Sequence, residues 1–374
     1  LPQFTSCCPA WVKFAEQYYP DMLPNLSSCK SPQQMFGSLA KDKISRDRNI
    51  PRENIVCVSI MPCTAKKFEA KREEFAVNGN PDVDYVLTTQ ELALMIKERG
   101  IDFGRLDPSS FDMPFGFKTG AGVIFGTSGG VSEAVLRYAA DKLGRGMNHE
   151  FHQLRYNRDL QAVEVEVAGI NLRLAIVSGL ANARRLMDDI RSGKEHFDLV
   201  EVMACCGGCV NGGGQPPGSS NGQDTLYKRS KGLYDNDKML QFHNASENYY
   251  LRQIYDQDLT DEHKTHSLLH TAYHNRKRIS GEDIELSAGT ATPDLELKIC
   301  FGTSCFLRGA QKLYGQLMEY VREQGLEERT QFTASFCSEQ CKRGPVLTVN
   351  GTMLEKCDIE KAKAQIALAL AVKK

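Results

Sequence analysis

The chain has 374 residues, of which 41% are hydrophobic and 25% are charged, and its formal net charge is -1. This composition supports one large core or several ordinary ones and excludes the basic surface of a nucleic-acid-binding protein. No apolar run approaches the roughly 18 residues of a membrane span, and the N-terminus has no signal pattern. We expect a cytoplasmic protein with no membrane span and no nucleic-acid partner.

Strand patterns alternate with helix patterns over the first three quarters of the chain. An apolar run predicts a buried strand that delivers Cys63 at its C-terminal end, and a second strand pattern ends on Cys205. The predicted strands are 53–63, 173–180 and 197–205, and the predicted helices are 65–76, 88–100 and 181–193. This alternation predicts an α/β fold with mostly parallel sheets flanked by helices.

The last quarter has its own pattern. Residues 280–296 are polar and rich in residues that break helices and strands, which predicts a linker. Beyond it, 297–325 predicts a strand, a loop with two cysteines and an amphipathic helix, and 332–354 predicts a strand, a second cysteine loop and a hairpin. We expect one domain at 1–279 and a small α/β domain at 297–374.

The thirteen cysteines are odd in number and clustered. This argues against a secreted disulfide framework and, in a reducing compartment, favours metal sites. Three of them, Cys29, Cys57 and Cys357, stand alone and are interpreted as small buried hydrophobic residues. Eight form two sets of four, a scattered set (Cys8, Cys63, Cys205 and Cys209) and a local set (Cys300, Cys305, Cys337 and Cys341).

The local set has the spacing Cys-x4-Cys, then 31 residues, then Cys-x3-Cys. Four thiolates on two loops of one small domain fit a 2Fe–2S cluster. A structural zinc site is the alternative, although zinc usually prefers shorter spacers.

Three segments around the scattered set carry a family resemblance. They read "TSCCPAW" (5–11), "MPCTAKKFE" (61–69) and "EVMACCGGCVNGGGQP" (201–216), with supporting stretches at 25–37 and 122–134. Together they resemble the signature segments of the iron-only (FeFe) hydrogenases, and the resemblance covers most of residues 1–275. It implies an H-cluster domain with two lobes of mostly parallel sheet flanked by helices. The implied activity is the interconversion of protons and electrons with H2.

The resemblance also implies a cofactor, the H-cluster. This is a 4Fe–4S cubane joined to a two-iron unit that carries CO, cyanide and a bridging azadithiolate. The implied cubane ligands are Cys8, Cys63, Cys205 and Cys209, with Cys209 bridging to the two-iron unit. The glycines at 212–214 would let the backbone approach this bulky group. A flexible glycine linker is the alternative.

Two residues are expected to carry protons. The family uses the cysteine at the position of Cys7 as a proton donor to the azadithiolate, and a thiol beside a cluster is a reasonable shuttle because its pKa can be tuned. Ser27 resembles the hydroxyl that continues this path, and a helix N-cap or turn hydroxyl is its alternative role. The family's further path residues lie upstream of the first signature, so we expect an additional N-terminal iron–sulfur segment or subunit to be needed.

Further residues match positions near the two-iron unit. Lys66 resembles the lysine that pairs with a cyanide ligand, since a cation is the expected partner of an anionic ligand. Met61 and Met203 match thioethers that pack on the unit, although core methionines would look the same. Gln33, Phe125 and Gly126 match positions around the CO and cyanide ligands. Cys206 lies at a variable position and is not counted as a ligand.

Residues 297–374 resemble the thioredoxin-like 2Fe–2S ferredoxin domain of NADH dehydrogenase-type subunits and some hydrogenases, which favours iron over zinc. The combination of both domains resembles NAD(P)-linked electron-bifurcating hydrogenases. It implies electron exchange with ferredoxin or an NAD(P)H-binding flavoprotein subunit, because no nucleotide-binding GxGxxG unit occurs in the chain. A hydrogen sensor or an electron-transfer protein with low turnover is the alternative, which the presence of Cys7 disfavours.

Overall fold

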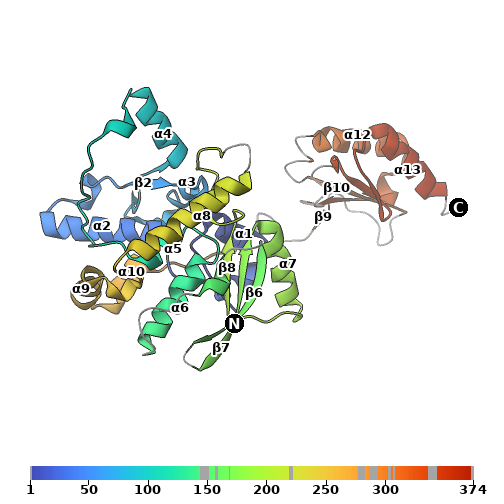
Figure 1. The fold of residues 1–374 in the computed structure, drawn as a ribbon. Coiled ribbons are helices and arrows are strands. Elements are labelled where there is room, and N and C mark those ends of the chain that lie inside the picture. The colour runs from blue at the N-terminus through green and yellow to red at the C-terminus, as the bar shows by residue number, and fades with distance from the viewer. Residues whose placement is uncertain are drawn as a thin grey trace. The chain divides into compact units, whose positions relative to one another are not determined.

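The computed structural model describes residues 2–143, 151–155, 159–167, 169–218, 222–276, 283–285, 294–301, 305, 308–335 and 343–371. The backbone contacts divide the chain into two units, Leu1–Lys277 and Arg278–Lys374 (Figure 1). Among the described residues, every helix is too short or too polar to traverse a lipid bilayer. The sequence-based boundaries at 279 and 297 stay a prediction.

The first unit mixes helices with strands of two to nine residues. Its helices are α1 (Pro9–Tyr18), α2 (Pro32–Arg48), α3 (Ala65–Glu69), α4 (Thr89–Glu98), α5 (Gly120–Ile124), α6 (Gly130–Lys142), α7 (Leu180–Arg191), α8 (Gly222–Met239), α9 (Tyr249–Gln257) and α10 (Glu262–Leu269). Its strands are β1 (Gln3–Phe4), β2 (Val58–Met61), β3 (Ala76–Val77), β4 (Asn80–Pro81), β5 (Tyr85–Thr88), β6 (Leu160–Val167), β7 (Ile170–Ser178) and β8 (Leu199–Met203).

The main sheet has the strand order β1-β8-β7-β6. Strand β8 pairs in parallel with β1 and β7, and β6 pairs with β7 in antiparallel orientation. Side chains of a strand alternate between its two faces, so Ala175 and Val177 of β7 pack with α1 and α7, whereas Leu174 and Ile176 pack with α6. The sheet is therefore buried on both faces, and β8 brings its C-terminal end into the interior.

A second, two-stranded sheet pairs β2 with β5 in parallel. It carries Cys63 two residues after β2 ends, close to the predicted position. The prediction that this strand is buried is wrong, because Val58 and Ile60 are each 51% exposed. The predicted helix at 65–76 is also shorter than expected and ends at Glu69.

The second unit is an α/β sandwich with one sheet. Its strands are β9 (Asp283–Glu285), β10 (Leu295–Cys300), β11 (Thr330–Ser335), β12 (Leu347–Val349) and β13 (Thr352–Leu354), and its described helices are α12 (Ala310–Glu323) and α13 (Ile359–Ala371). The strand order is β13-β12-β10-β11-β9, with β10 and β11 parallel. The predicted hairpin is present between β12 and β13, where Asn350 and Gly351 adopt the positive φ angles that its turn requires.

Five residues of the predicted linker are part of this sheet, Asp283–Glu285 in β9 and Leu295 and Glu296 in β10. Strand β9 pairs in antiparallel orientation with β11. The sequence gives little sign of it because a short edge strand can gain its stability from the neighbour's hydrogen bonds rather than from its own apolar pattern. The linker prediction at 280–296 is therefore wrong for Asp283–Glu285 and for Leu295 and Glu296.

Candidate metal centre

The four scattered cysteines are held by three separate parts of the first unit. Cys8 is the N-cap residue of α1. Cys63 lies in the turn between β2 and α3, and Cys205 and Cys209 follow β8. The backbone N–H of Ala204 donates to the Cys8 sulfur at 3.5 Å, which joins the first and third parts directly.

Electrostatic interactions connect every pair of these four thiols. Burial is the main cause that raises the pKa of Cys209 to about 12, and the Cys8 and Cys63 thiols raise it further. Burial also raises the pKa of Cys63, while the backbone N–H groups of Lys66 and Ala65 oppose this rise. Four thiols that repel one another once ionised are a ligand set for a cation or cationic cluster.

The arrangement fits a cluster of several irons. Soft thiolate ligands favour iron–sulfur clusters, whose ligands bind different metal atoms. Within the described ranges, no three His, Cys, Asp or Glu side chains converge closely enough for a single metal ion. Four thiols within electrostatic range of one another, on segments that the Ala204–Cys8 bond joins, fit the implied cubane by the chemistry of their donor atoms.

The glycines of the third segment have a structural reason that the sequence did not indicate. A Cβ added to Gly212 would lie 2.0 Å from the carbonyl oxygen of Pro62, and one added to Gly214 would lie 2.7 Å from the backbone nitrogen of Cys63. The Gly214 N–H also donates to the Pro62 carbonyl at 3.0 Å. These two glycines let one ligand loop lie directly on the other, so the flexible-linker alternative is wrong.

Cys7 and Lys66 meet beside the ligand set. The Lys66 ammonium donates to the Cys7 carbonyl at 3.0 Å and forms an ion pair with Glu69 at 3.0 Å, and both side chains are buried. Burial raises the pKa of the Cys7 thiol well above its ordinary value, and the Cys8 and Cys209 thiols raise it further. Cys7 is therefore a protonated thiol at neutral pH.

Gln33 joins this polar cluster from α2. Its amide donates to a Glu69 oxygen at 3.3 Å and to the Lys66 carbonyl at 3.4 Å, and it accepts from the Ser59 hydroxyl at 2.9 Å. The Ser31 hydroxyl donates to the same Glu69 oxygen at 2.9 Å. Gln33 and Lys66, which the sequence predicts to lie near the same site, are therefore in contact with each other.

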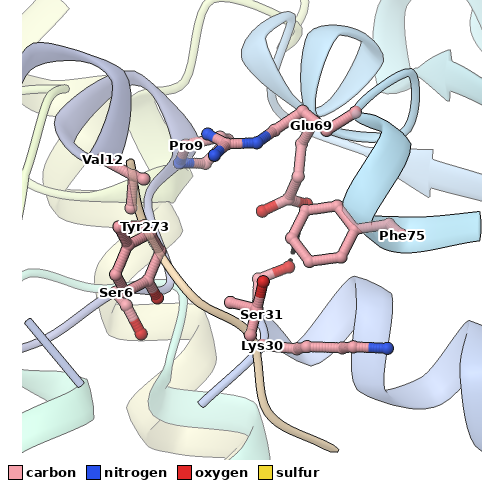
Figure 2. A pocket seen from close by; sticks show the side chains of 10 residues that line it. Ser6, Pro9, Val12, Lys30, Ser31, Glu69, Phe75 and Tyr273 are labelled. Carbon is pink, nitrogen blue, oxygen red and sulfur yellow. Dashed lines mark hydrogen bonds between the residues drawn. The ribbon is translucent and has the colours of Figure 1, made fainter. Parts of the chain in front are cut away.

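A cavity of about 10 Å³, room for about one water molecule, lies next to this cluster. Figure 2 shows Ser6 and Tyr273 on one side of it and Glu69 and Phe75 on the other, with Ser31 bonded to Glu69. Polar groups face the cavity from both sides, so a water molecule there would have hydrogen-bond partners.

The remaining predicted residues lie nearby or elsewhere. Met203 is 2% exposed at the end of β8, and Met61 is half-buried at the end of β2. The Gly126 carbonyl accepts from the Val210 N–H at 2.9 Å, which sets Gly126 against the Cys209 loop. Phe125 also borders an apolar cavity of about 600 Å³ between α2, α5 and α6.

Ser27 takes the turn role that the sequence had left open. Its hydroxyl accepts from the Cys29 N–H at 3.3 Å, and its carbonyl accepts from the Tyr273 hydroxyl at 2.7 Å. Among the described residues, no hydrogen bond joins it to Cys7, so its part in a proton path stays a prediction. Cys206 is exposed, and its pKa is raised by burial and by Asp159.

In the second unit, Cys300 and Cys305 are each 3% exposed and belong to one small hydrophobic cluster. A Cβ on Gly344 would lie 2.7 Å from the Cys305 sulfur, so backbone approaches this cysteine closely. Cys337 and Cys341 lie outside the described residues.

The sequence did not single out Glu69, Ser31 or Tyr273. The spacing of Lys66 and Glu69, three residues apart on a helix, was a usable signal because such residues are neighbours. Ser31 and Tyr273 gave none, since only the tertiary fold brings them to the site.

Comparisons with known proteins agree with this picture. The family model of the iron-only hydrogenase large subunit, C-terminal domain, matches residues 1–213, the iron hydrogenase small subunit matches 223–276, and the thioredoxin-like [2Fe-2S] ferredoxin matches 289–369. The fold and the converging thiols define a protein that binds iron–sulfur clusters. More particularly, the chain belongs to the iron-only hydrogenase family. These matches confirm both predicted cofactors, the H-cluster and the 2Fe–2S cluster.

The chain is similar to the NADP-reducing hydrogenase subunit HndD of Solidesulfovibrio fructosivorans, with 45% identity over 283 residues, 75% of this chain and 48% of that protein. It is also similar to the cytosolic Fe-S cluster assembly factor narfl of Xenopus tropicalis, with 35% identity over 75% of this chain and 60% of that protein. A solved structure of apo [FeFe]-hydrogenase HydA1 from Chlamydomonas reinhardtii, variant C377H, matches with a TM-score of 0.64 and 35% identity, covering 74% of this chain and 77% of that one. The chain spans about half the length of HndD and three fifths of narfl.

Proposed function

We propose that this chain is a catalytic hydrogenase subunit that interconverts two protons and two electrons with H2. The observation that carries the proposal is that four cysteines from three remote segments lie near one another, with the Ala204 N–H bonded to the Cys8 sulfur and Cys7 directly before Cys8. When bound, the H-cluster would supply the redox-active iron at which protons and electrons combine. Cys8, Cys63, Cys205 and Cys209 would hold it, with Cys209 as the bridging ligand.

The polar residues around the ligands would carry protons and supply a positive charge beside the cluster. The Cys7 thiol holds a proton at neutral pH and lies within electrostatic range of Cys209, so it is the residue best suited to deliver a proton at the site. The Lys66 ammonium supplies a buried positive charge for an anionic group, and Glu69 and Gln33 fix its position. We include Ser27 as the next proton carrier and Met61, Met203, Phe125 and Gly126 as the wall of the site.

The second unit would relay electrons. We propose that Cys300 and Cys305, together with Cys337 and Cys341, hold its 2Fe–2S cluster, and that ferredoxin or an NAD(P)-binding flavoprotein exchanges electrons with it. The similarity to a subunit of an NADP-reducing hydrogenase supports such a partner. We also propose a cytoplasmic location, since clustered cysteines are typical of reducing compartments.

The role of Cys7 gives the direct test of this function. In the anaerobically matured chain, Cys7→Ser should lower the rate of hydrogen evolution from a reduced artificial donor by a factor of about 10² to 10⁴ or more. Its iron content should stay that of the parent, because Cys7 is a proton carrier and not a ligand. Cys206→Ser is the matched control: it is the neighbour of a candidate ligand, is exposed, and should change neither quantity. A Cys7→Ser protein that keeps most of its turnover would refute the assignment.

The electron relay is tested separately with Cys305→Ser in the full chain. This variant should lose the electron paramagnetic resonance signal of the reduced 2Fe–2S cluster while the hydrogen-evolving site stays loaded. Loss of zinc in place of iron would show that the second unit holds a structural zinc site.

A second candidate function is iron–sulfur cluster assembly or transfer, which the similarity to narfl favours. In that case the matured chain would bind iron and release it to an acceptor protein without evolving hydrogen. Hydrogen evolution by the parent chain separates the two candidates.

A further inference from the structure

Glu201 opens the third cysteine segment but has no part in the function proposed above. Its side chain is 0% exposed. One carboxylate oxygen accepts from the Gly129 N–H at 2.6 Å, and the other accepts from the Ser132 N–H at 2.8 Å. Both oxygens are therefore used by backbone groups at the start of α6, although Glu201 lies on β8, about 70 residues further along the chain.

Helix α6 depends on this distant side chain. Helices usually have a Ser, Thr, Asp or Asn at the N-cap, whose side chain accepts from the free N–H groups of the first turn. The N-cap of α6 is Gly129, which has no side chain and a φ of +91°. A Cβ there would lie 1.9 Å from the Leu154 carbonyl oxygen, so no capping residue can replace this glycine. The Glu201 carboxylate supplies the cap from outside, where its charge also suits the helix dipole.

The 125–129 segment, which Glu201 holds at Gly129, packs against the loop that carries Cys209. The Ser128 N–H donates to the Gly207 carbonyl at 3.2 Å, and the Val210 N–H donates to the Gly126 carbonyl at 2.9 Å. A Cβ on Gly208 would lie 2.5 Å from the backbone nitrogen of Ser128. The two loops, 125–129 and 207–210, thus lie backbone against backbone with no side chains between them.

These contacts form a closed connection. Strand β8 runs from Glu201 through Met203 into the Cys205–Cys209 loop, this loop bonds to the 125–129 loop, and that loop bonds back to Glu201. A displacement of the carboxylate would therefore move the wall that bears Phe125 and Gly126 relative to Cys209.

A fully buried carboxylate is a costly way to cap a helix. Burial raises its pKa, which the backbone N–H groups of Ser132 and Gly129 oppose. Removing a charge from water costs several kcal/mol unless hydrogen bonds compensate it.

We propose that Glu201 is a positioning residue that fixes the 125–129 loop against the Cys209 loop and so sets the environment of the two-iron unit; this rests on the function proposed above. The perturbation is Glu201→Gln in the full chain, which keeps the size of the side chain but replaces one of its two acceptor oxygens with a donor. The control is Asp261→Asn, which weakens the N-cap bond to His263 at the start of α10, at an exposed position.

Two measurements decide the proposal. Hydrogen–deuterium exchange of the apo chain should be faster in Glu201→Gln both at 125–132 and at 207–212, by about 10- to 100-fold, as the loss of a hydrogen bond to a charged group predicts. The infrared bands of CO and cyanide in the matured variant should shift or broaden while the iron content stays that of the parent. Asp261→Asn should change neither.

Faster exchange confined to 129–132, with unchanged infrared bands, would overturn the proposal and leave Glu201 as a helix cap only. A parent chain without CO and cyanide bands would overturn the proposed function, and the exchange data would still show whether the loops are coupled. If Glu201→Gln does not fold, Glu201→Asp replaces it, because it keeps the charge and shortens the reach by one methylene group.

Discussion

Replacing Arg72 tests how the fold holds two of the cysteine ligands together. Arg72 lies after α3, which follows Cys63, and its guanidinium makes two bonds to Glu16 of α1, which follows Cys8. The distances are 2.7 and 3.1 Å, and the side chains of Arg72 and Glu16 are 4% and 0% exposed. This buried ion pair joins α1, which follows Cys8, to the turn after α3, which follows Cys63.

Arg72→Met removes the charge and leaves Glu16 buried. Arg276 is the remaining cation near Glu16 among the described residues, at 3.5 Å and half-exposed, so it compensates only in part. Breaking a buried pair from one side typically costs about 3 to 5 kcal/mol, whereas replacing both partners by apolar residues is often nearly neutral. We therefore expect a loss of about 3 to 5 kcal/mol for Arg72→Met and a smaller loss for the double variant Glu16→Leu/Arg72→Met.

Urea unfolding of the apo chain measures this loss. Trp11 is the single tryptophan, is fully buried in α1 and lies 5.8 Å from the Phe4 ring, so its fluorescence reports the unfolding of the first unit. Lys228→Met is the control, because it breaks an exposed pair with Asp224 and should cost at most about 1 kcal/mol. A loss below about 1 kcal/mol for Arg72→Met, or a double variant less stable than the single one, would refute the reasoning.

Two further predictions concern the ligand loops. The Cys209 thiol has a pKa of about 12 in the folded apo chain, against 9.0 ordinarily. The unfolded chain therefore loses this proton more readily, so the contribution of Cys209 to the free energy of unfolding is complete below pH 9 and is lost as the pH rises from 9 toward 12. At about 1.4 kcal/mol for each pH unit, the loss of free energy of unfolding reaches at most about 4 kcal/mol. In urea unfolding, the free energy of unfolding should fall less between pH 7 and pH 10.5 in Cys209→Ala than in the parent chain. Gly212→Ala should reduce cluster affinity by about 10- to 100-fold, measured as iron content, because it separates two ligand loops. Gly213→Ala should not, since its Cβ would have Thr64 Oγ1 at 3.7 Å as its nearest contact; equal iron in both variants would contradict the glycine argument.

The sequence predicted the parts of the site that short segments carry. Cys63 follows a strand and Cys205 follows another, as the apolar runs indicated, because a run of apolar residues that ends at a cysteine depends mainly on local pattern. The hairpin at Asn350 and Gly351 was likewise predictable from its turn residues.

The sequence could not predict the contacts that join distant segments. Glu201 and Gly129 meet through the pairing of β8 within the sheet, and the local sequence of neither segment indicates this contact. Helix α3 ends at Glu69, and three residues later Arg72 has an extended backbone and bonds to Glu16, a contact that no local pattern indicates. The exposure of β2 also depends on which elements cover it and not on its own apolar residues.

The most direct test of the account is infrared spectroscopy of the anaerobically matured 374-residue chain, with iron content measured on the same sample. The account predicts the stretching bands of CO and cyanide in the parent chain, their retention in Cys7→Ser, and their loss in Cys209→Ala. Iron-loaded parent protein without these bands would contradict the central claim that the scattered cysteines hold an H-cluster.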